Sequence, residues 1–307
     1  MRLLLWLVAL TSWLLASAQE LQPVRVGLLQ IVDALPVFVA RDQGLFQQAG
    51  LAPDIITFAS AAERNDAIVA GELDFWIGDV VSMALLRKAA PVRIAFLALG
   101  ATPQEGRFAI LVPPNSPLQA LADLHGHPVA ISQNSVIEFV LDQLLAGTGI
   151  SVQKQVVDNI AQRFQLLVDG QVDAAVLPDP LLSLAVTLGA RILQDDTAEN
   201  ISQSVWGIRE GAENLLPALQ QAYNQAVDLI NADPQGFIPV LARDARLPPQ
   251  IQTSFVVVPY PRVQLPTPAQ VERVINWLVS DKGLLAPGEV TYEGLVVPGA
   301  VPAMEGY

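Results

Sequence analysis

Acidic and small polar side chains gather at four places where a strand-like apolar run gives way to a helix-like run. Asp33, Asp79 and Asp179 each follow one such strand, and the fourth place is the segment 132–135, with Glu138 one turn later. In open parallel α/β sheets, ligands bind beyond the carboxyl ends of the strands, where loops lead into helices. We therefore expect one ligand cleft, and its candidate contacts are Asp33, Asp79, Ser132, Asn134, Ser135, Glu138 and Asp179.

The carboxylates at these junctions restrict the charge of the ligand. A helix N-terminus ordinarily favours an anion, but a sulfonate or nitrate among Asp33, Asp79 and Asp179 would be repelled by ~1–4 kcal/mol per charge pair at about 4 Å. The pattern therefore favours an amine or an N-heterocycle that donates hydrogen bonds. The alternative is that the aspartates only cap their helices, and that Ser135-x-x-Glu138 is a capping box.

The residue types that carry most catalytic and metal chemistry are rare in this chain. It has no cysteine and two histidines, His125 and His127, which precede a strand at its amino end, opposite the expected cleft. This His-x-His pair brings no third metal ligand, and no nucleophile elbow, phosphate loop or dinucleotide fingerprint occurs. We expect no metal, no cofactor and no catalytic residue. An exported enzyme that uses Asp79 or Glu138 as general base is the alternative.

An internal repeat predicts two similar α/β units. Several residues recur 99 positions later in the same context, where a helix ends at a glycine and an aspartate opens a short buried strand. The matched pairs are Arg64 and Arg163, Gly71 and Gly170, Asp74 and Asp173, Gly50 and Gly149, and Leu51 and Ile150. Five matches at one offset indicate duplicated architecture. Alternating strand-like and helix-like runs predict largely parallel sheets covered by helices.

The order of these runs predicts how the chain is divided. We expect residues 19–107 and 207–307 to form lobe I and residues 108–206 to form lobe II. The last hundred residues, with helices over 211–243 and 267–281 and Thr267 as an N-cap before Pro268, return to cover lobe I. The stretch 259–268 is expected to wrap the surface. Two chain crossings, near 108 and near 206, make a hinge.

Two aromatic residues at the expected crossings, Phe108 and Trp206, are further candidate ligand contacts. Trp76 and Phe139 lie on apolar elements, and we expect them in the core. The loop 102–107 precedes the first crossing and could supply a polar wall, with Arg107 either facing the ligand or pairing with a carboxylate.

The amino-terminal residues have the pattern of a secretory signal peptide over 1–18. Arg2 precedes an apolar run over 3–15 that is too short to span a bilayer, and Ala16-Ser17-Ala18 fits a cleavage site. We expect export and a soluble mature chain that begins at Gln19. The net charge of −13 repels phosphate backbones and argues against a nucleic-acid partner.

Four segments carry a resemblance to a known family. They are DALP opening a helix that closes in ARDQGLF…AGL, then AGELDFWIGD, LADLHGHPVAIS and DGQVDAAVLPDP. In this order the chain resembles the nitrate/sulfonate/taurine-type substrate-binding proteins of ABC importers, which are related to binders of thiamine pyrimidine precursors. The resemblance covers essentially the whole mature chain.

The resemblance implies a type II periplasmic-binding fold and a role without catalysis. The expected protein is a periplasmic or otherwise exported monomer that captures a small polar ligand between its lobes and delivers it to an ABC permease in the membrane. An amine or N-heterocycle such as an aminopyrimidine is the favoured ligand. A small anion, such as a sulfonate, nitrate or a taurine-like molecule, is the alternative.

Overall fold

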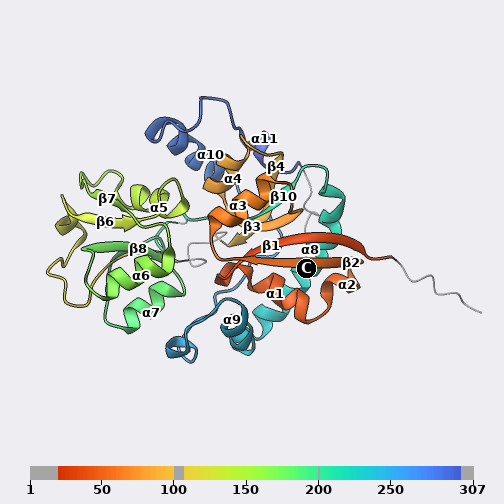
Figure 1. Cartoon of the computed structure of the whole chain (residues 1–307), viewed down its shortest axis with the longest axis horizontal. Coiled ribbons are helices and arrows are strands. Elements are labelled where there is room, and N and C mark those ends of the chain that lie inside the picture. The colour runs from red at the N-terminus through yellow and green to blue at the C-terminus, as the bar shows by residue number, and fades with distance from the viewer. Residues whose placement is uncertain (1–19, 100–106, 200, 299–307) are drawn as a thin grey trace, which may run out of the picture.

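Two separate β-sheets organise the chain, each at the centre of one lobe (Figure 1). The computed structural model describes residues 20–99, 107–199 and 201–298. The expected signal peptide at 1–18 and residues 102–106 of the predicted polar loop lie outside the described residues.

The first sheet has the strand order β2-β1-β3-β10-β4. Its strands are β1 (Gln22–Leu29), β2 (Leu51–Phe58), β3 (Phe75–Asp79), β4 (Val92–Leu99) and β10 (Ser204–Arg209). Strand β1 pairs with β2 and β3 in parallel, whereas β10 runs antiparallel to both β3 and β4. Four strands therefore point one way and β10 points the other way.

The second sheet repeats this arrangement, with the strand order β7-β6-β8-β5-β9. Its strands are β5 (Phe108–Val112), β6 (Pro128–Ile131), β7 (Gln153–Val156), β8 (Ala174–Pro178) and β9 (Arg191–Asp195). Here β5 is the strand that runs antiparallel to its neighbours β8 and β9. The predicted α/β class with two similar, largely parallel sheets is confirmed.

Helices pack against these sheets. Those that belong to the two repeats are α1 (Leu35–Asp42), α2 (Leu45–Gln48), α3 (Ala61–Val69) and α4 (Val80–Leu86), then α5 (Val136–Leu145), α6 (Ile160–Val168) and α7 (Leu181–Thr187). Those that follow β10 are α8 (Leu216–Ala232), α9 (Ile238–Asp244), α10 (Pro268–Asn276), the π-helical turn η6 (Trp277–Asp281) and α11 (Tyr292–Leu295).

The helices after β10 lie against the first lobe, as the sequence predicted. Helix α8 packs on α1 and α2, and α10 packs on α4. The predicted helix over 211–243 is broken after Ala232, because Asp233 caps a new turn that begins at Pro234. The predicted cap at Thr267 is confirmed, since its hydroxyl accepts the Gln270 N–H and Pro268 opens the helix.

The internal repeat extends to individual hydrogen bonds. Arg64 Nη1 donates to the carbonyl of Ile77 at 2.7 Å, and Arg163 Nε donates to the carbonyl of Val176 at 2.9 Å. Ile77 and Val176 are again 99 residues apart. Gly71, at the end of α3, has a φ of 73°, a left-handed conformation that favours glycine. The offset therefore reflects two copies of one arrangement.

Each of the two crossings runs between the carboxyl edges of the two sheets. β5 begins at Phe108, which pairs with Pro178 at the carboxyl end of β8, and β10 begins at Ser204, which pairs with Asp79 at the carboxyl end of β3. The carboxyl edges of the two sheets consequently face each other. The whole of β10 belongs to the first sheet, so the second crossing lies before Ser204 and the predicted lobe boundary at 206 is wrong by a few residues.

Hydrogen bonds tie the two crossings together at both ends. Next to the first lobe, Ser204 Oγ accepts the Leu99 N–H at 3.1 Å. Next to the second lobe, the buried carboxylate of Asp196 accepts the Phe108 N–H at 2.8 Å and the hydroxyl of Ser202. Hydrogen bonds therefore join the described ends of the two crossings next to each lobe.

One apolar cluster continues from one lobe into the other. It includes Val81 and Met83 on α4, Phe139 and Leu141 on α5, and Trp277 on η6. Helices α4 and α5 are in direct contact. Within the described residues, no helix is long and apolar enough to cross a membrane.

The buried Asp196 carboxylate predicts a pH-dependent contribution to stability. Burial raises its pKa to about 6, above the ordinary value of an aspartate, so the folded protein binds a proton that the unfolded chain has already released. The stability that Asp196 contributes should be fully present near pH 4 and lost as the pH rises to about 6.

We expect the Asp196→Asn variant to lack this dependence because the asparagine amide does not titrate, while its oxygen can still accept the Phe108 N–H. The measurement is urea unfolding of both proteins from pH 4 to pH 8, with Asp54→Asn as a control for the loss of one charge at an exposed position. A constant difference in unfolding free energy between wild type and Asp196→Asn across this range would contradict the prediction.

Candidate functional site

Residues from both lobes line a cavity of about 400 Å³ at the lobe boundary. It lies between α7 of the second lobe and the segment 251–260 that follows α9. Apolar side chains form most of its wall, including Leu182, Val186, Ile251 and Phe255. Its polar lining residues are Arg107, Asp179, Ser183, Thr187, Ser254 and Tyr260.

The four predicted junctions do lie at the carboxyl ends of β1, β3, β6 and β8. Asp33 is partly buried after β1, and its Oδ1 accepts the Ser204 hydroxyl at 2.6 Å. Burial raises the pKa of Asp33, and the carboxylates of Asp179 and Asp79 raise it further. Asp79 from the first lobe and Asp179 from the second lobe are therefore both close enough to act on Asp33.

Asp79 and Asp179 are occupied in holding the helices that follow them. Asp79 Oδ1 accepts the Ser82 N–H at 2.8 Å at the start of α4. Asp179 Oδ1 accepts both the N–H and the hydroxyl of Ser183 in α7. Burial raises the pKa of Asp179. The capping role that the sequence left open is thus realised at both positions.

The loop 132–135 lies beyond β6, and its polar groups are partly used within the loop. Ser135 Oγ donates to the Ser132 carbonyl at 2.8 Å and accepts the Ile137 N–H. Asn134 is exposed and has a left-handed backbone with a φ of 52°, a conformation that asparagine tolerates. Gln133 is exposed beside it, so this loop has two side chains open to solvent.

Glu138 does not present a free carboxylate. Its side chain is 2% exposed, Oε2 accepts the Asn134 N–H at 2.7 Å, and Oε1 accepts Lys154 at 2.8 Å and Lys282 at 2.6 Å. Burial alone would raise the pKa of Glu138, but these hydrogen bonds lower it below its ordinary value. The expectation that Glu138 adds uncompensated negative charge to the cleft is wrong, because two lysines neutralise it. The predicted bond to the Ser135 backbone is replaced by the bond to Asn134.

The aromatic candidates divide between core and boundary. Trp206 is completely buried and stacks on Phe75 with ring centroids 4.8 Å apart, so it belongs to the core of the first lobe and not to the cleft. This corrects its prediction as a ligand contact, since the crossing ends before β10. Phe108 is partly exposed at the start of β5. Trp76 and Phe139 are core residues, as predicted.

Tyr260 at the boundary was not identified as a candidate from the sequence, whereas Arg107 was given two alternative roles. Tyr260 lies within the stretch predicted to wrap the surface, yet it is buried, lines the cavity and donates its hydroxyl to the Val32 carbonyl at 2.6 Å. Arg107 lines the same cavity and pairs with Asp195 at 3.1 Å. No local pattern marks Tyr260, because its position depends on how the chain returns to the first lobe.

The repeated arginines lie beneath the two carboxyl edges. Gly78 has no side chain, and a Cβ atom added there would lie 3.9 Å from Arg64 Nη1. The guanidinium therefore lies beside the Asp79 junction. Arg163 donates to Ser132 Oγ at 2.9 Å as well as to Val157 and Val176 carbonyls. Within the described ranges neither arginine forms an ion pair with a carboxylate. Burial lowers the pKa of both to about 10.

His125 and His127 each make a hydrogen-bond contact at the protein surface. His127 Nδ1 is 2.8 Å from the Asp173 carboxylate, and His125 Nδ1 accepts the Ser151 N–H. Across residues 20–99, 107–199 and 201–298, no group of three acidic or histidine side chains is placed to hold a metal ion.

Comparison with known proteins agrees with this architecture. The model of the family described as NMT1/THI5 like matches residues 32–181. A protein of Escherichia coli K12 named as an aliphatic sulfonates-binding protein is 24% identical over 278 residues, which are 86% of this chain and 85% of the relative. The resemblance predicted from the sequence is confirmed.

Solved structures share the type II periplasmic-binding fold. The alkanesulfonate-binding protein of Xanthomonas axonopodis pv. citri, solved with bound MOPS, superimposes with a TM-score of 0.73 at 24% identity over 91% of this chain and 99% of that one. A ligand-binding component of an ABC-type import system from Staphylococcus aureus gives a TM-score of 0.73 at 14% identity over 90% and 97%. Two of these three proteins are thus named as sulfonate-binding proteins and one as a component of an import system.

The different hydrogen bonds of Arg64 and Arg163 predict that their removal lowers the free energy of unfolding by different amounts. Arg163→Met removes the donor from two buried carbonyls, Val157 and Val176, and from the part-buried Ser132 hydroxyl, and should lower the free energy of unfolding by about 2–4 kcal/mol. Arg64→Met removes it from one buried carbonyl, Ile77, and from the part-buried Asn65 side chain, and should cost about 1–2 kcal/mol.

Urea unfolding of the two variants tests this difference within one molecule. Arg262→Met serves as the exposed control and should change the unfolding free energy by at most about 1 kcal/mol. A cost for Arg64→Met equal to or above that for Arg163→Met would show that the hydrogen bonds described here do not set the stability of the two edges.

Proposed function

We propose that this protein is the solute-binding subunit of an ABC importer and that it closes its two lobes on a small organic anion of the sulfonate type. It is an exported monomer that delivers this ligand to a membrane permease, and it carries out no chemical reaction. The fold, the family resemblance and a cavity shared by two hinged lobes support this role.

The observation that carries the ligand class is the balance of satisfied and unsatisfied charge at the two facing edges. The carboxylates of Asp79 and Asp179 cap helices, Asp33 accepts a hydroxyl and has a raised pKa, and Glu138 is paired with lysines. The buried guanidiniums of Arg64 and Arg163 hydrogen-bond only to neutral groups, and the carboxylates of Asp79 and Asp158 act on them without a direct ion pair. A buried cation without a paired anion is unfavourable, so an anionic ligand improves the electrostatics of closure.

The cavity wall supports an organic ligand over an inorganic ion. Leu182, Val186, Ile251 and Phe255 would contact an alkyl or ring portion. Among the described lining residues Arg107 is the cation, and we propose that it meets a negatively charged head group while it keeps its pairing with Asp195. Nitrate has no apolar portion to contact this wall. The named function of the Escherichia coli relative and the MOPS bound to the Xanthomonas protein point to the same chemistry.

The amine or N-heterocycle favoured from the sequence is the weaker candidate. It depended on free carboxylates at the junctions, and these groups are engaged within the protein. The ligand contacts that we propose are Asp179, Arg107 and Tyr260, which line the cavity, and six residues of the facing edges outside its lining: Asp33, Asp79, Phe108, Ser132, Asn134 and Ser135. An enzymatic role needs an available base, and Glu138 is a poor one because its lysine partners lower its pKa.

A pair of ligands that differ only in head group tests the proposed class. We expect 1-butanesulfonate to raise the melting temperature of the mature protein and 1-butylamine to leave it unchanged, because the apolar portion is common to both. Small-angle scattering at saturating sulfonate should show a more compact molecule. Stabilisation by 1-butylamine or by an aminopyrimidine alone would contradict the proposal.

Arg107→Gln should weaken binding of 1-butanesulfonate by about tenfold or more, the scale of one charged hydrogen bond of ~1.5–3 kcal/mol. Isothermal titration calorimetry gives the affinity. Arg191→Gln is the matched control on β9, where the guanidinium contacts Gln119, Ser116 and Leu118 instead of the cavity. Equal affinities for Arg107→Gln and wild type would remove Arg107 from the site.

A further inference from the structure

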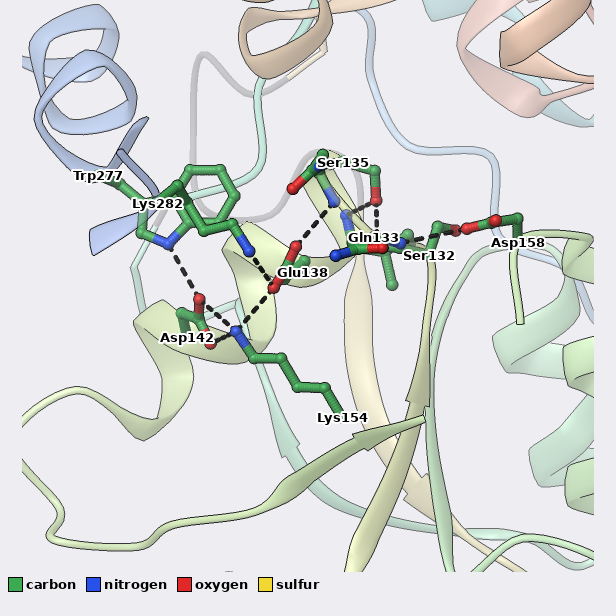
Figure 2. A network of polar contacts seen from close by, with 11 residues as sticks. Ser132, Gln133, Ser135, Glu138, Asp142, Lys154, Asp158, Trp277 and Lys282 are labelled. Carbon is green, nitrogen blue, oxygen red and sulfur yellow. Dashed lines mark hydrogen bonds and ion pairs between the residues drawn. The ribbon is translucent and has the colours of Figure 1, made fainter. Parts of the chain in front are cut away.

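A charged cluster connects the two lobes where η6 meets α5 (Figure 2), and none of its residues lines the cavity. It consists of Glu138 and Asp142 on α5, Lys154 on β7, and Trp277 and Lys282 at and after η6. Helix α5 and strand β7 belong to the second lobe, whereas η6 continues α10, which packs on α4 of the first lobe. We call these five residues the interlobe clamp.

Glu138 is the centre of the clamp. Its Oε1 accepts Lys154 from its own lobe at 2.8 Å and Lys282 from the other lobe at 2.6 Å. A carboxylate that is 2% exposed needs such partners, since a buried unpaired charge is strongly unfavourable. Lys282 is itself only 17% exposed, so solvent screens this contact weakly.

Neighbouring contacts hold Lys282 in this place. Trp277 Nε1 donates to Asp142 Oδ2 at 2.9 Å, and its ring meets Phe139 edge-on with centroids 5.3 Å apart. Lys282 Nζ lies 5.7 Å from the centroid of the same indole ring. The apolar and charged contacts together fix η6 on α5.

The second oxygen of Glu138 acts on the loop 132–135. Oε2 accepts the N–H of Asn134, the residue whose backbone is left-handed. Figure 2 shows this carboxylate between the lysines on one side and the loop on the other. One side chain therefore links a contact made by the first lobe to the conformation of a loop in the second lobe.

We propose that Lys282 is a positioning residue for the ligand loop 132–135 and that it acts through Glu138 across the lobe boundary. This inference rests on the proposed function, because it assigns the loop to the ligand cleft. The contact of η6 and Lys282 with α5 thereby sets the conformation in which Ser132, Asn134 and Ser135 bind the ligand.

Amide hydrogen exchange of the mature protein without ligand tests the positioning role directly. In Lys282→Met, exchange of the 133–135 amides should accelerate about tenfold or more, while amides of α6 in the same lobe stay unchanged. Lys282→Arg should restore slow exchange, because it retains the charge and donors. Lys88→Met is the matched control, since Lys88 contacts Leu284 and Glu289 and does not reach the second lobe.

Affinity for 1-butanesulfonate supplies the functional readout. We expect Lys282→Met to weaken binding about tenfold and Lys282→Arg and Lys88→Met to bind as the wild type does. A lower melting temperature with unchanged loop exchange, or faster exchange throughout the second lobe, would overturn the positioning role. Faster loop exchange with unchanged affinity would overturn the link to the ligand. If wild type does not bind the sulfonate, the proposed ligand class fails, and the exchange result still decides the positioning role.

Discussion

The parallel pairing of strands is the constraint on which the site depends. Because four strands in each sheet run in one direction, their loops and helix starts gather at one edge. The strand that enters each sheet from the other lobe, β5 or β10, starts at this same edge and runs antiparallel. Both crossings therefore span the distance between two carboxyl edges, and the edges must face each other.

The charge that a ligand would experience at these edges depends on which contacts each charged side chain already makes. Aspartates that begin helices are held by the N–H groups of the first turn, as at Ser82 and Ser183. The arginines beneath the edges bind carbonyls, which satisfies their hydrogen-bonding capacity without neutralising their charge. Counting acidic residues in the sequence gives the sign of the net charge, but the potential that a ligand meets depends on which of these charges remain uncompensated.

The boundary between the lobes has two unlike sides. On the side of α4, α5 and η6, apolar residues pack continuously from one lobe into the other, and Lys282 pairs with buried Glu138. On the side of α7 and the segment 251–260, a cavity remains. The lobe closure that we propose would be a rotation about the packed side that narrows the cavity. Closure of this kind needs no rearrangement inside either sheet.

The amino-acid sequence by itself determined the repeat, the α/β class, the two sheets and the positions of the four junctions. These features are local, because strand and helix periodicity and caps such as Thr267 depend on residues a few positions apart, and the repeat is a comparison within the chain. The resemblance to the family could also be found from short ordered motifs. Even the error at the second crossing was small, since β10 reads as a strand and only its partner sheet was ambiguous.

Tertiary structure alone decided which side chains face the ligand and with what charge. Glu138 meets Lys282 from 144 residues away, Tyr260 reaches Val32 across the first lobe, and Trp206 stacks on Phe75 in the core. None of these pairings leaves a mark in the spacing of nearby residues. Long-range packing brings such groups together, and the burial and hydrogen bonds it creates determine whether a carboxylate is free, capped or neutralised.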